Sequence, residues 1–195
     1  MCKTIVLYGC AMGNREDLLV GAMRCLFEKG YARTTARDIA SAAGVSLAAI
    51  GYHYGTKEDL LNAALYQALA EWGDDLGKAL AAATRPDATP AEQFEETWTQ
   101  VLRTFAANER LWAVQFELLA FLGQKPDLKA AFAAANRQGR QGLADLFGVT
   151  GETVGAVFQA LVGGLAAQWL VDPESTPSGR DLRKALLAIA DAVGD

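Results

Sequence analysis

Apolar residues recur at helical spacing along most of the chain, and glycine, proline and capping residues interrupt the pattern. The pattern predicts one helix between Asn14 and Gly30 and two short helices between Thr35 and Tyr54. Longer helices are predicted over about 57–83, 90–107, 109–123, 126–147, 151–171 and 178–193. We therefore expect an all-α fold, with an N-terminal three-helix head, a long linking fourth helix and a C-terminal bundle of about five further helices.

The two short helices have the spacing of a helix-turn-helix. Thr35 can cap the first, and Gly44 can end it because glycine adopts the left-handed conformation without a side-chain clash. Ser46 follows two residues later and can cap the second helix. In such a unit the second helix enters a DNA groove. The candidate DNA-binding residues are Thr35, Arg37, Ser46, Leu47, Ala48, Tyr52, His53 and Lys57.

The second short helix has few side chains that can form hydrogen bonds. Leu47 and Ala48 can touch a thymine methyl group but cannot make bidentate contacts with purines. Sequence readout should therefore depend on Ser46 and Tyr52, on Thr35 and Arg37 of the preceding helix, and on DNA shape.

Five runs around this unit follow one known pattern: Phe27-Glu28-Lys29-Gly30-Tyr31, Thr34-Thr35-Ala36-Arg37-Asp38-Ile39-Ala40, Ala43-Gly44-Val45-Ser46, Tyr52-His53-Tyr54 and Lys57-Glu58-Asp59-Leu60-Leu61. They resemble the DNA-binding domain of the TetR family of bacterial transcription regulators. The resemblance implies a repressor that a small apolar or amphipathic ligand releases from a palindromic operator. The chain departs from the family at Gly51, where family members often carry tyrosine.

The start of the fourth helix is a candidate phosphate site. Thr56 can cap this helix, and Lys57 lies in its first turn beside free backbone N–H groups. Lys57 is either a solvated surface lysine or, as the family resemblance implies, a DNA contact. His53 is the only histidine, and no partner for catalysis lies at a fixed spacing from it, so we expect no enzyme activity, no metal site and no cofactor. A helical enzyme or cofactor-binding protein is the alternative class.

The predicted helix over 109–123 is apolar almost all round, which is typical of a helix in the middle of a domain. With aromatic residues of its neighbours it either lines a ligand cavity or fills the core. In the second case the protein would be a DNA-binding regulator without small-molecule input. The candidate ligand-binding residues are Tyr66, Trp98, Phe105, Trp112, Gln115, Phe116, Asn136, Phe158 and Gln159.

The last two predicted helices are the candidate dimer interface. Ala160-Leu161-Val162-Gly163-Gly164-Leu165 and the following Gln168-Trp169-Leu170-Val171-Asp172-Pro173 resemble the penultimate helix of TetR-family regulators. In that family the last two helices pair with those of a second copy, which implies a homodimer. Packing within one chain would explain the same residues. The candidate interface residues are Val157, Leu161, Gly164, Leu165, Leu182, Leu186 and Ile189.

The charge distribution agrees with a DNA-binding head. The net charge is −5, but residues 1–60 carry seven Lys or Arg against six Asp or Glu, so the remaining residues hold −6. The three cysteines form no disulfide framework, which favours a cytoplasmic protein. No run is long and apolar enough to cross a membrane.

We expect three segments. Residues 1–13 form an arm that is disordered or packs on the head, unless translation begins at Met12. Residues 14–56 form the helix-turn-helix domain, and residues 57–195 form the domain for ligand binding and dimerisation.

Overall fold

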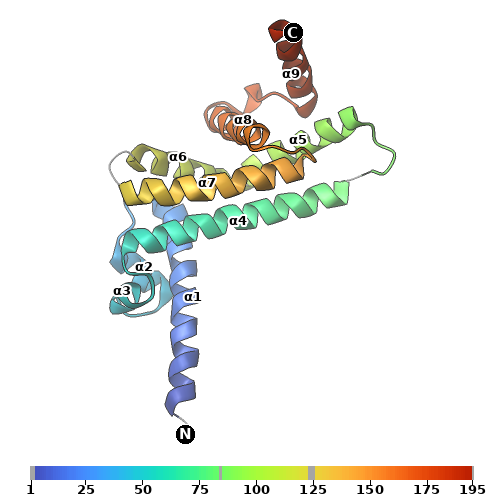
Figure 1. Cartoon of the computed structure of the whole chain (residues 1–195). Helices are drawn as coiled ribbons and strands as arrows, with labels where there is room; N and C mark the ends of the chain where they lie inside the picture. Colours follow the sequence, from blue (N-terminus) through green and yellow to red (C-terminus); the bar gives the residue numbers. More distant parts are fainter. Residues whose placement is uncertain (1–2, 84, 123–125, 195) are drawn as a thin grey trace. The chain divides into compact units, whose positions relative to one another are not determined.

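The computed structural model describes residues 3–83, 85–122 and 126–194. This part of the chain contains nine α-helices, one short 3-10 helix and no strand, so the prediction of an all-α fold is confirmed (Figure 1). The elements are α1 (Lys3–Lys29), α2 (Ala36–Ala43), α3 (Ala48–Tyr54), α4 (Lys57–Ala83), α5 (Pro90–Ala107), α6 (Glu109–Phe121), α7 (Pro126–Leu146), α8 (Glu152–Val171), η2 (Pro173–Ser175) and α9 (Gly179–Val193).

Local sequence signals account for most helix ends. Thr35 caps α2 in a capping box with Asp38, and Gly44 ends that helix with a left-handed φ of 68°. Thr89 and Ser178 form the same kind of box at the starts of α5 and α9. Because these signals act within one helical turn, they can be recognised in the sequence without knowledge of the tertiary fold.

Two predicted helix starts are wrong. Helix α1 begins at Lys3, so Asn14 lies inside a helix instead of capping one, and the described part of the expected arm is helical. The first 13 residues contain no proline that would end a helix. Ser46 does not cap α3, whose N-cap is Leu47 without a side-chain hydrogen bond. The backbone carbonyl of Ser46 instead accepts a 3.0 Å bond from Ala49 N–H, so a backbone turn leads into the helix.

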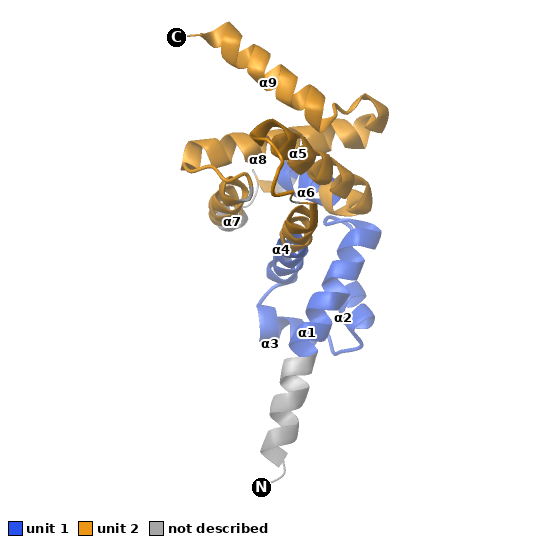
Figure 2. Ribbon diagram, turned by 90° about the vertical axis from the view of Figure 1, so that its right-hand side faces the viewer, with its two compact units in different colours: residues 1–71, 113–121 blue, residues 72–112, 122–195 orange. Residues whose placement is uncertain are grey.

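The chain forms two compact units (Figure 2). Unit 1 comprises residues 1–71 and 113–121, and unit 2 comprises residues 72–112 and 122–195. The boundaries between these units fall inside α4 and α6. Each of these two helices therefore contributes residues to both units.

The core of unit 1 contains buried residues of α1, α2, α3 and the start of α4, and α1, α2 and α3 pack on one another. Leu18, Leu26, Ile39 and Leu60 are fully buried there. Helices α1 and α2 approach closely at Gly21, where an added Cβ would lie 2.9 Å from Ala43 N. The three helices of the head are thus held by apolar packing.

Unit 2 is a bundle in which α5 packs on α8 and α9, and α7 packs on α8. A Cβ on Gly179 would overlap the Glu95 carbonyl oxygen, so glycine allows the start of α9 to lie against α5. The Glu95 carboxylate also accepts a 2.7 Å bond from Arg183 Nε and a 3.4 Å bond from Arg180 Nε. These ion pairs attach α9 to the rest of the unit and hold the pKa of Glu95 below its usual value, chiefly through Arg183.

Helix α8 has the length and composition of a membrane-spanning helix, so the expectation that no run is long and apolar enough to cross a membrane is wrong. Its most apolar window has a mean hydropathy of 1.6, and 22% of that window is buried inside the chain. The core helix of a water-soluble protein can meet the same criteria. Among the described residues, α8 is the only helix that does so.

Candidate functional site

Helix α3 presents the surface expected to read DNA. Its Ile50 side chain points into the core of unit 1 and is 4% exposed, whereas Leu47 is 49% and Tyr52 81% exposed. Ser46 and Ala48 are exposed beside them. This face of α3 is therefore available to a partner.

Gly51 leaves the outer face of α3 without a side chain at that position. An added Cβ there would have no neighbouring atom within 4 Å. Packing therefore does not require glycine at the position where family members often carry tyrosine. The tyrosine on this face is Tyr52, whose ring lies edge-on to that of His53 with centroids 4.8 Å apart.

Contacts with α1 fix the far end of α3. The Tyr54 hydroxyl donates a 2.9 Å hydrogen bond to the Arg15 carbonyl oxygen. The Arg15 guanidinium carbon lies 5.2 Å from the centroid of the Tyr54 ring, within the range of a cation–π contact. No sequence pattern indicates this pair, because it joins residues far apart in the chain.

Helix α2 is fixed by an ion pair at its first turn. Lys29 Nζ donates a 2.6 Å bond to Asp38 Oδ1, and Asp38 Oδ2 accepts bonds from the Thr35 hydroxyl and backbone N–H. These contacts, the lysine first, hold the pKa of Asp38 well below its usual range. The spacing Thr35-x-x-Asp38 is the sequence signal for this role of Asp38. Arg37 is exposed and has no partner among the described residues, so its charge is available.

Lys57 has internal contacts instead of a free ammonium group. Its Nζ donates a 3.0 Å bond to the Thr34 carbonyl oxygen and lies 3.6 Å from a Glu58 carboxylate oxygen. Thr56 caps α4 as expected, since its hydroxyl accepts a 3.0 Å bond from Asp59 N–H. The ammonium group has three N–H donors, so the bond to Thr34 leaves donors that can contact a phosphate.

The nine candidate ligand-binding residues divide between the two units. Tyr66, Gln115 and Phe116 belong to unit 1, where the Tyr66 hydroxyl and Gln115 Oε1 are buried without a hydrogen-bond partner among the described residues. The six in unit 2 are Trp98, Phe105, Trp112, Asn136, Phe158 and Gln159.

The aromatic residues of unit 2 form two groups of contacting rings, which together we call the aromatic cluster. The first group is Phe94, Trp98, Phe147 and Phe158, and the second is Trp72, Phe105, Trp112 and Trp169. Phe147 and Phe158 stack with centroids 4.1 Å apart, and Trp98 lies 5.2 Å from Phe147. The cluster holds two buried indole N–H groups, of Trp98 and Trp112, that find no acceptor in the described chain. A buried donor without an acceptor typically costs about 1–3 kcal/mol, so these two groups are unusual.

The two polar candidates of unit 2 bind each other. Gln159 Nε2 lies 3.3 Å from both the carbonyl and the side-chain oxygen of Asn136, and Gln159 Oε1 accepts a 3.1 Å bond from Arg140 Nε. They link α7 to α8. These two polar candidates thus have partners within the chain, whereas Gln115 Oε1 has none among the described residues.

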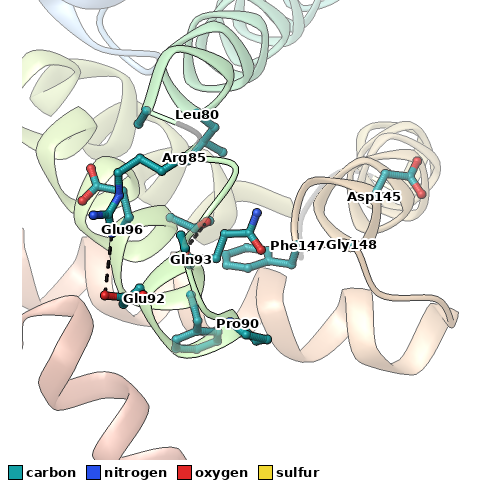
Figure 3. Close-up of a pocket in the computed structure, with 13 residues that line it drawn as sticks. Leu80, Arg85, Pro90, Glu92, Gln93, Glu96, Asp145, Phe147 and Gly148 are labelled. Atoms are coloured by element: carbon teal, nitrogen blue, oxygen red, sulfur yellow. Dashed lines mark hydrogen bonds and ion pairs between the residues drawn. The ribbon is translucent and has the colours of Figure 1, made fainter.

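A cavity of about 350 Å³ lies in unit 2 beside the aromatic cluster (Figure 3). Phe94 and Phe147 of the cluster form part of its wall, and Arg85 and Glu92 approach to 3.9 Å at its edge. None of the nine predicted ligand-binding residues lines it. Its lining residues are Leu80, Ala83, Arg85, Ala88, Pro90, Glu92, Gln93, Phe94, Glu96, Thr97, Asp145, Phe147 and Gly148.

Comparison with known families tests the resemblance. Residues 18–64 match the model of the bacterial regulatory proteins of the tetR family, and residues 89–192 match the tetracyclin repressor-like C-terminal domain. The chain belongs to the TetR family. The regulator therefore pairs the family's helix-turn-helix head with its helical C-terminal domain, and it is a transcriptional regulator.

Individual relatives of this TetR-family regulator agree. The probable HTH-type transcriptional regulator ArpR of Pseudomonas putida is 27% identical over 194 residues, which cover 89% of this chain and 88% of ArpR. The HTH-type transcriptional regulator TtgR, also of Pseudomonas putida, is 39% identical over 69 residues, 35% of this chain and 32% of TtgR. The crystal structure of the multidrug binding protein EbrR with imidazole has a TM-score of 0.68 at 24% identity, covering 88% of this chain and 93% of that one, and shows the same fold.

The predicted dimer residues of the TetR-family regulator differ in their exposure to solvent. Leu165 is 6% and Leu182 7% exposed, so both pack inside their own chain. Val157 and Ile189 are 53% and 59% exposed, Gly164 is exposed, and Leu161 and Leu186 are half-buried. Of the seven predicted interface residues, these last five are at least partly exposed.

Proposed function

We propose that this TetR-family regulator is a repressor that binds a palindromic operator as a homodimer, with α3 of each copy in a major groove. The observation that carries the proposal is the outward face of α3, where Leu47 and Tyr52 are exposed while Ile50 and Tyr54 anchor the helix. Leu47 and Ala48 suit thymine methyl groups, and Tyr52 and Arg37 can bond to bases or phosphates. The proposal places the protein in the cytoplasm with the DNA.

A second copy would cover the exposed apolar face of α8 and α9. Val157 and Ile189 are more than half exposed although both are large and apolar. Only 22% of the apolar α8 window is buried within one chain, which leaves surface that favours association. Gly164 carries no side chain, so two α8 helices can approach closely at that point. A two-fold dimer would hold two α3 helices at a fixed separation, which a palindromic site requires.

The proposed effector is a small aromatic or amphipathic molecule that binds at the aromatic cluster. The cavity reaches the cluster at Phe94 and Phe147, whose ring centroids lie 6.3 Å and 5.2 Å from that of Trp98. The indole N–H group of Trp98, which contacts both rings, lacks an acceptor in the described chain, so a ligand that carries an oxygen or nitrogen acceptor would supply one. Such a ligand would shift the population away from the DNA-binding conformer, with a coupling of about 1–3 kcal/mol.

A regulator without small-molecule input is the second candidate. Trp98 and Phe105 are fully buried and pack on neighbouring rings, which is also how a filled core looks. The two candidates differ in their response to ligands. All four tryptophans lie outside the helix-turn-helix, so their fluorescence would report binding at the cluster independently of DNA. If a compound saturates that fluorescence change and operator affinity stays the same, the effector proposal is wrong.

The decisive experiment is fluorescence anisotropy with labelled duplexes tiled across the DNA that flanks the gene. We expect one palindromic fragment to bind tightly, to resist competition by scrambled duplex and to weaken steeply with salt. Equal affinity for all duplexes, in tiles extended across the genome, would contradict the proposed function.

Two variants with the same charge change sharpen this experiment. Arg37→Ala removes an exposed cation next to α3, and we expect weaker binding with a log–log salt slope reduced by about 1. Arg110→Ala removes an exposed cation from unit 2 and should leave both the affinity and the slope unchanged. Equal effects of the two variants would mean that α3 and its surroundings are not the DNA surface.

A further inference from the structure

The second half of α6 contributes one carboxylate to the head. Residues 113–121 belong to unit 1, and within them Glu117 is half-buried. Its Oε2 accepts a 2.9 Å hydrogen bond from the backbone N–H of Tyr31, and its Oε1 accepts a 2.9 Å bond from the N–H of Ala32. Each carboxylate oxygen thus binds one of two successive backbone donors in the turn between α1 and α2.

This turn, residues 30–34, also carries the contacts that join the helices of the head. The Thr34 hydroxyl donates to the carbonyl oxygens of Gly30 and Cys25 at the end of α1, at 2.7 and 3.1 Å. The Thr34 carbonyl oxygen accepts the bond from Lys57 at the start of α4. Thr35, the next residue, caps α2. The turn therefore connects the end of α1 to the start of α2 and is bonded to the first residue of α4.

The absence of a side chain at Gly30 leaves space for the Glu117 carboxylate. Its φ of 82° lies in the left-handed region that favours glycine. A Cβ at this position would also lie 2.6 Å from Glu117 Oε2, so any larger residue would displace the carboxylate. The turn thus has both the donors and the space that the carboxylate needs.

We propose that Glu117 is a positioning residue for DNA binding: its carboxylate holds the 30–34 turn and so orients α2 and α3 for the operator. The inference rests on the proposed function for its DNA readout. It assigns a role in DNA binding to a side chain from α6, outside the helix-turn-helix.

The chemistry requires a carboxylate of this length. Two N–H donors need two acceptor oxygens, and an ionised carboxylate supplies both. A glutamine amide has one oxygen, so its NH₂ group would face the second N–H. Aspartate keeps the charge but is shorter by one methylene and cannot reach both donors from the same backbone position.

The test compares Glu117→Gln and Glu117→Asp with Glu109→Gln, which makes the same charge change as Glu117→Gln at an exposed position of α6. The first measurement, on the full chain without DNA, is hydrogen exchange at the amides of Tyr31 and Ala32. We expect exchange there to be at least about tenfold faster in both Glu117 variants, with little change at the buried amides of Leu26 and Leu60. Glu109→Gln should behave as wild type.

The second measurement is affinity for the operator duplex and for scrambled duplex. We expect both Glu117 variants to bind the operator about tenfold more weakly than wild type while nonspecific affinity stays within about twofold. Exchange at Tyr31 and Ala32 equal to that of the control would overturn the inference without any DNA. So would wild-type operator affinity in both Glu117 variants. If wild type itself prefers no duplex, the proposed function and the DNA-binding role of Glu117 both fail, while the exchange result still shows whether Glu117 holds the turn.

Discussion

The helix-turn-helix head and the aromatic cluster of unit 2 differ in whether their buried polar side-chain atoms have hydrogen-bond partners. In the head, short side chains such as Thr34, Thr35 and Asp38 bind backbone groups and each other. No described side chain between residues 14 and 61 has a buried polar atom without a partner. In the cluster, the indole N–H groups of Trp98 and Trp112 are buried without an acceptor in the described part of the chain.

The two regions therefore differ in how strongly hydrogen bonds restrict their conformation. A network of short hydrogen bonds is specific in direction, so the head has a single favourable arrangement. In the cluster, the unpaired indole donors favour a partner that supplies acceptors. These properties agree with the proposed binding of DNA by the head and of a small-molecule ligand by the cluster. Mutations in each region test this contrast.

The largest expected effect is on stability, from the centre of the cluster. Trp98→Ala removes a fully buried ring, and we expect the free energy of unfolding to fall by about 3–5 kcal/mol in a urea titration. Tyr52→Ala removes an 81% exposed ring from α3 and should change the unfolding free energy by less than about 0.5 kcal/mol, while operator affinity falls about tenfold. Similar stability losses in the two variants would remove the contrast between the regions.

Within the cluster, a paired indole can be compared with the unpaired ones. Trp72 Nε1 donates a 2.9 Å bond to the Thr104 hydroxyl. Thr104→Val keeps the shape but removes the acceptor, so we expect unfolding to become easier by about 1–2 kcal/mol. Thr104→Ser keeps the hydroxyl and should lose less. If Thr104→Val has wild-type stability, the cluster tolerates unpaired indoles without cost, and the argument for an acceptor-bearing ligand fails.

In the head, the corresponding change is loss of a cap. Thr35→Ala removes the hydroxyl that accepts from Asp38 N–H, and we expect a loss of about 1 kcal/mol with weaker operator binding. Thr35→Ser retains the cap and serves as the control. Circular dichroism during thermal unfolding and anisotropy with the operator measure the two effects. Unchanged stability of Thr35→Ala would show that the ion pair of Asp38 with Lys29 is sufficient to start α2.

The smallest expected effect concerns pH and the attachment of α9. Arg183 and, to a lesser extent, Arg180 hold the pKa of Glu95 below the ordinary glutamate value of 4.5. The ion pairs therefore contribute stability that is present above about pH 4.5 and is lost as pH falls through the lowered pKa of the folded protein. Unfolding between about pH 7 and pH 3 should show a shallower pH dependence for Glu95→Gln than for wild type. Identical slopes would mean that Glu95 does not contribute to acid sensitivity.

Most of the fold follows from short-range signals. Helices α4 and α5 begin and end where the helical periodicity, a threonine cap and the Pro90 start predicted, because each signal involves residues within one turn. The sequence failed at the start of α3, where a backbone turn at Ser46 replaces the expected side-chain cap. The predicted start of α1 was also wrong, because α1 already begins at Lys3 and Asn14, a good capping residue, lies inside the helix.

The sequence by itself determined the all-α class, the helix-turn-helix and most helix boundaries, because periodicity and capping depend on neighbours a few residues apart. Only the tertiary structure decided that Leu165 and Leu182 are buried within their own chain, that Lys57 is bonded to Thr34, and that Glu117 binds the turn at Tyr31. The last two contacts join residues 23 and 86 positions apart. Their existence depends on how helices pack side by side, which no local pattern encodes.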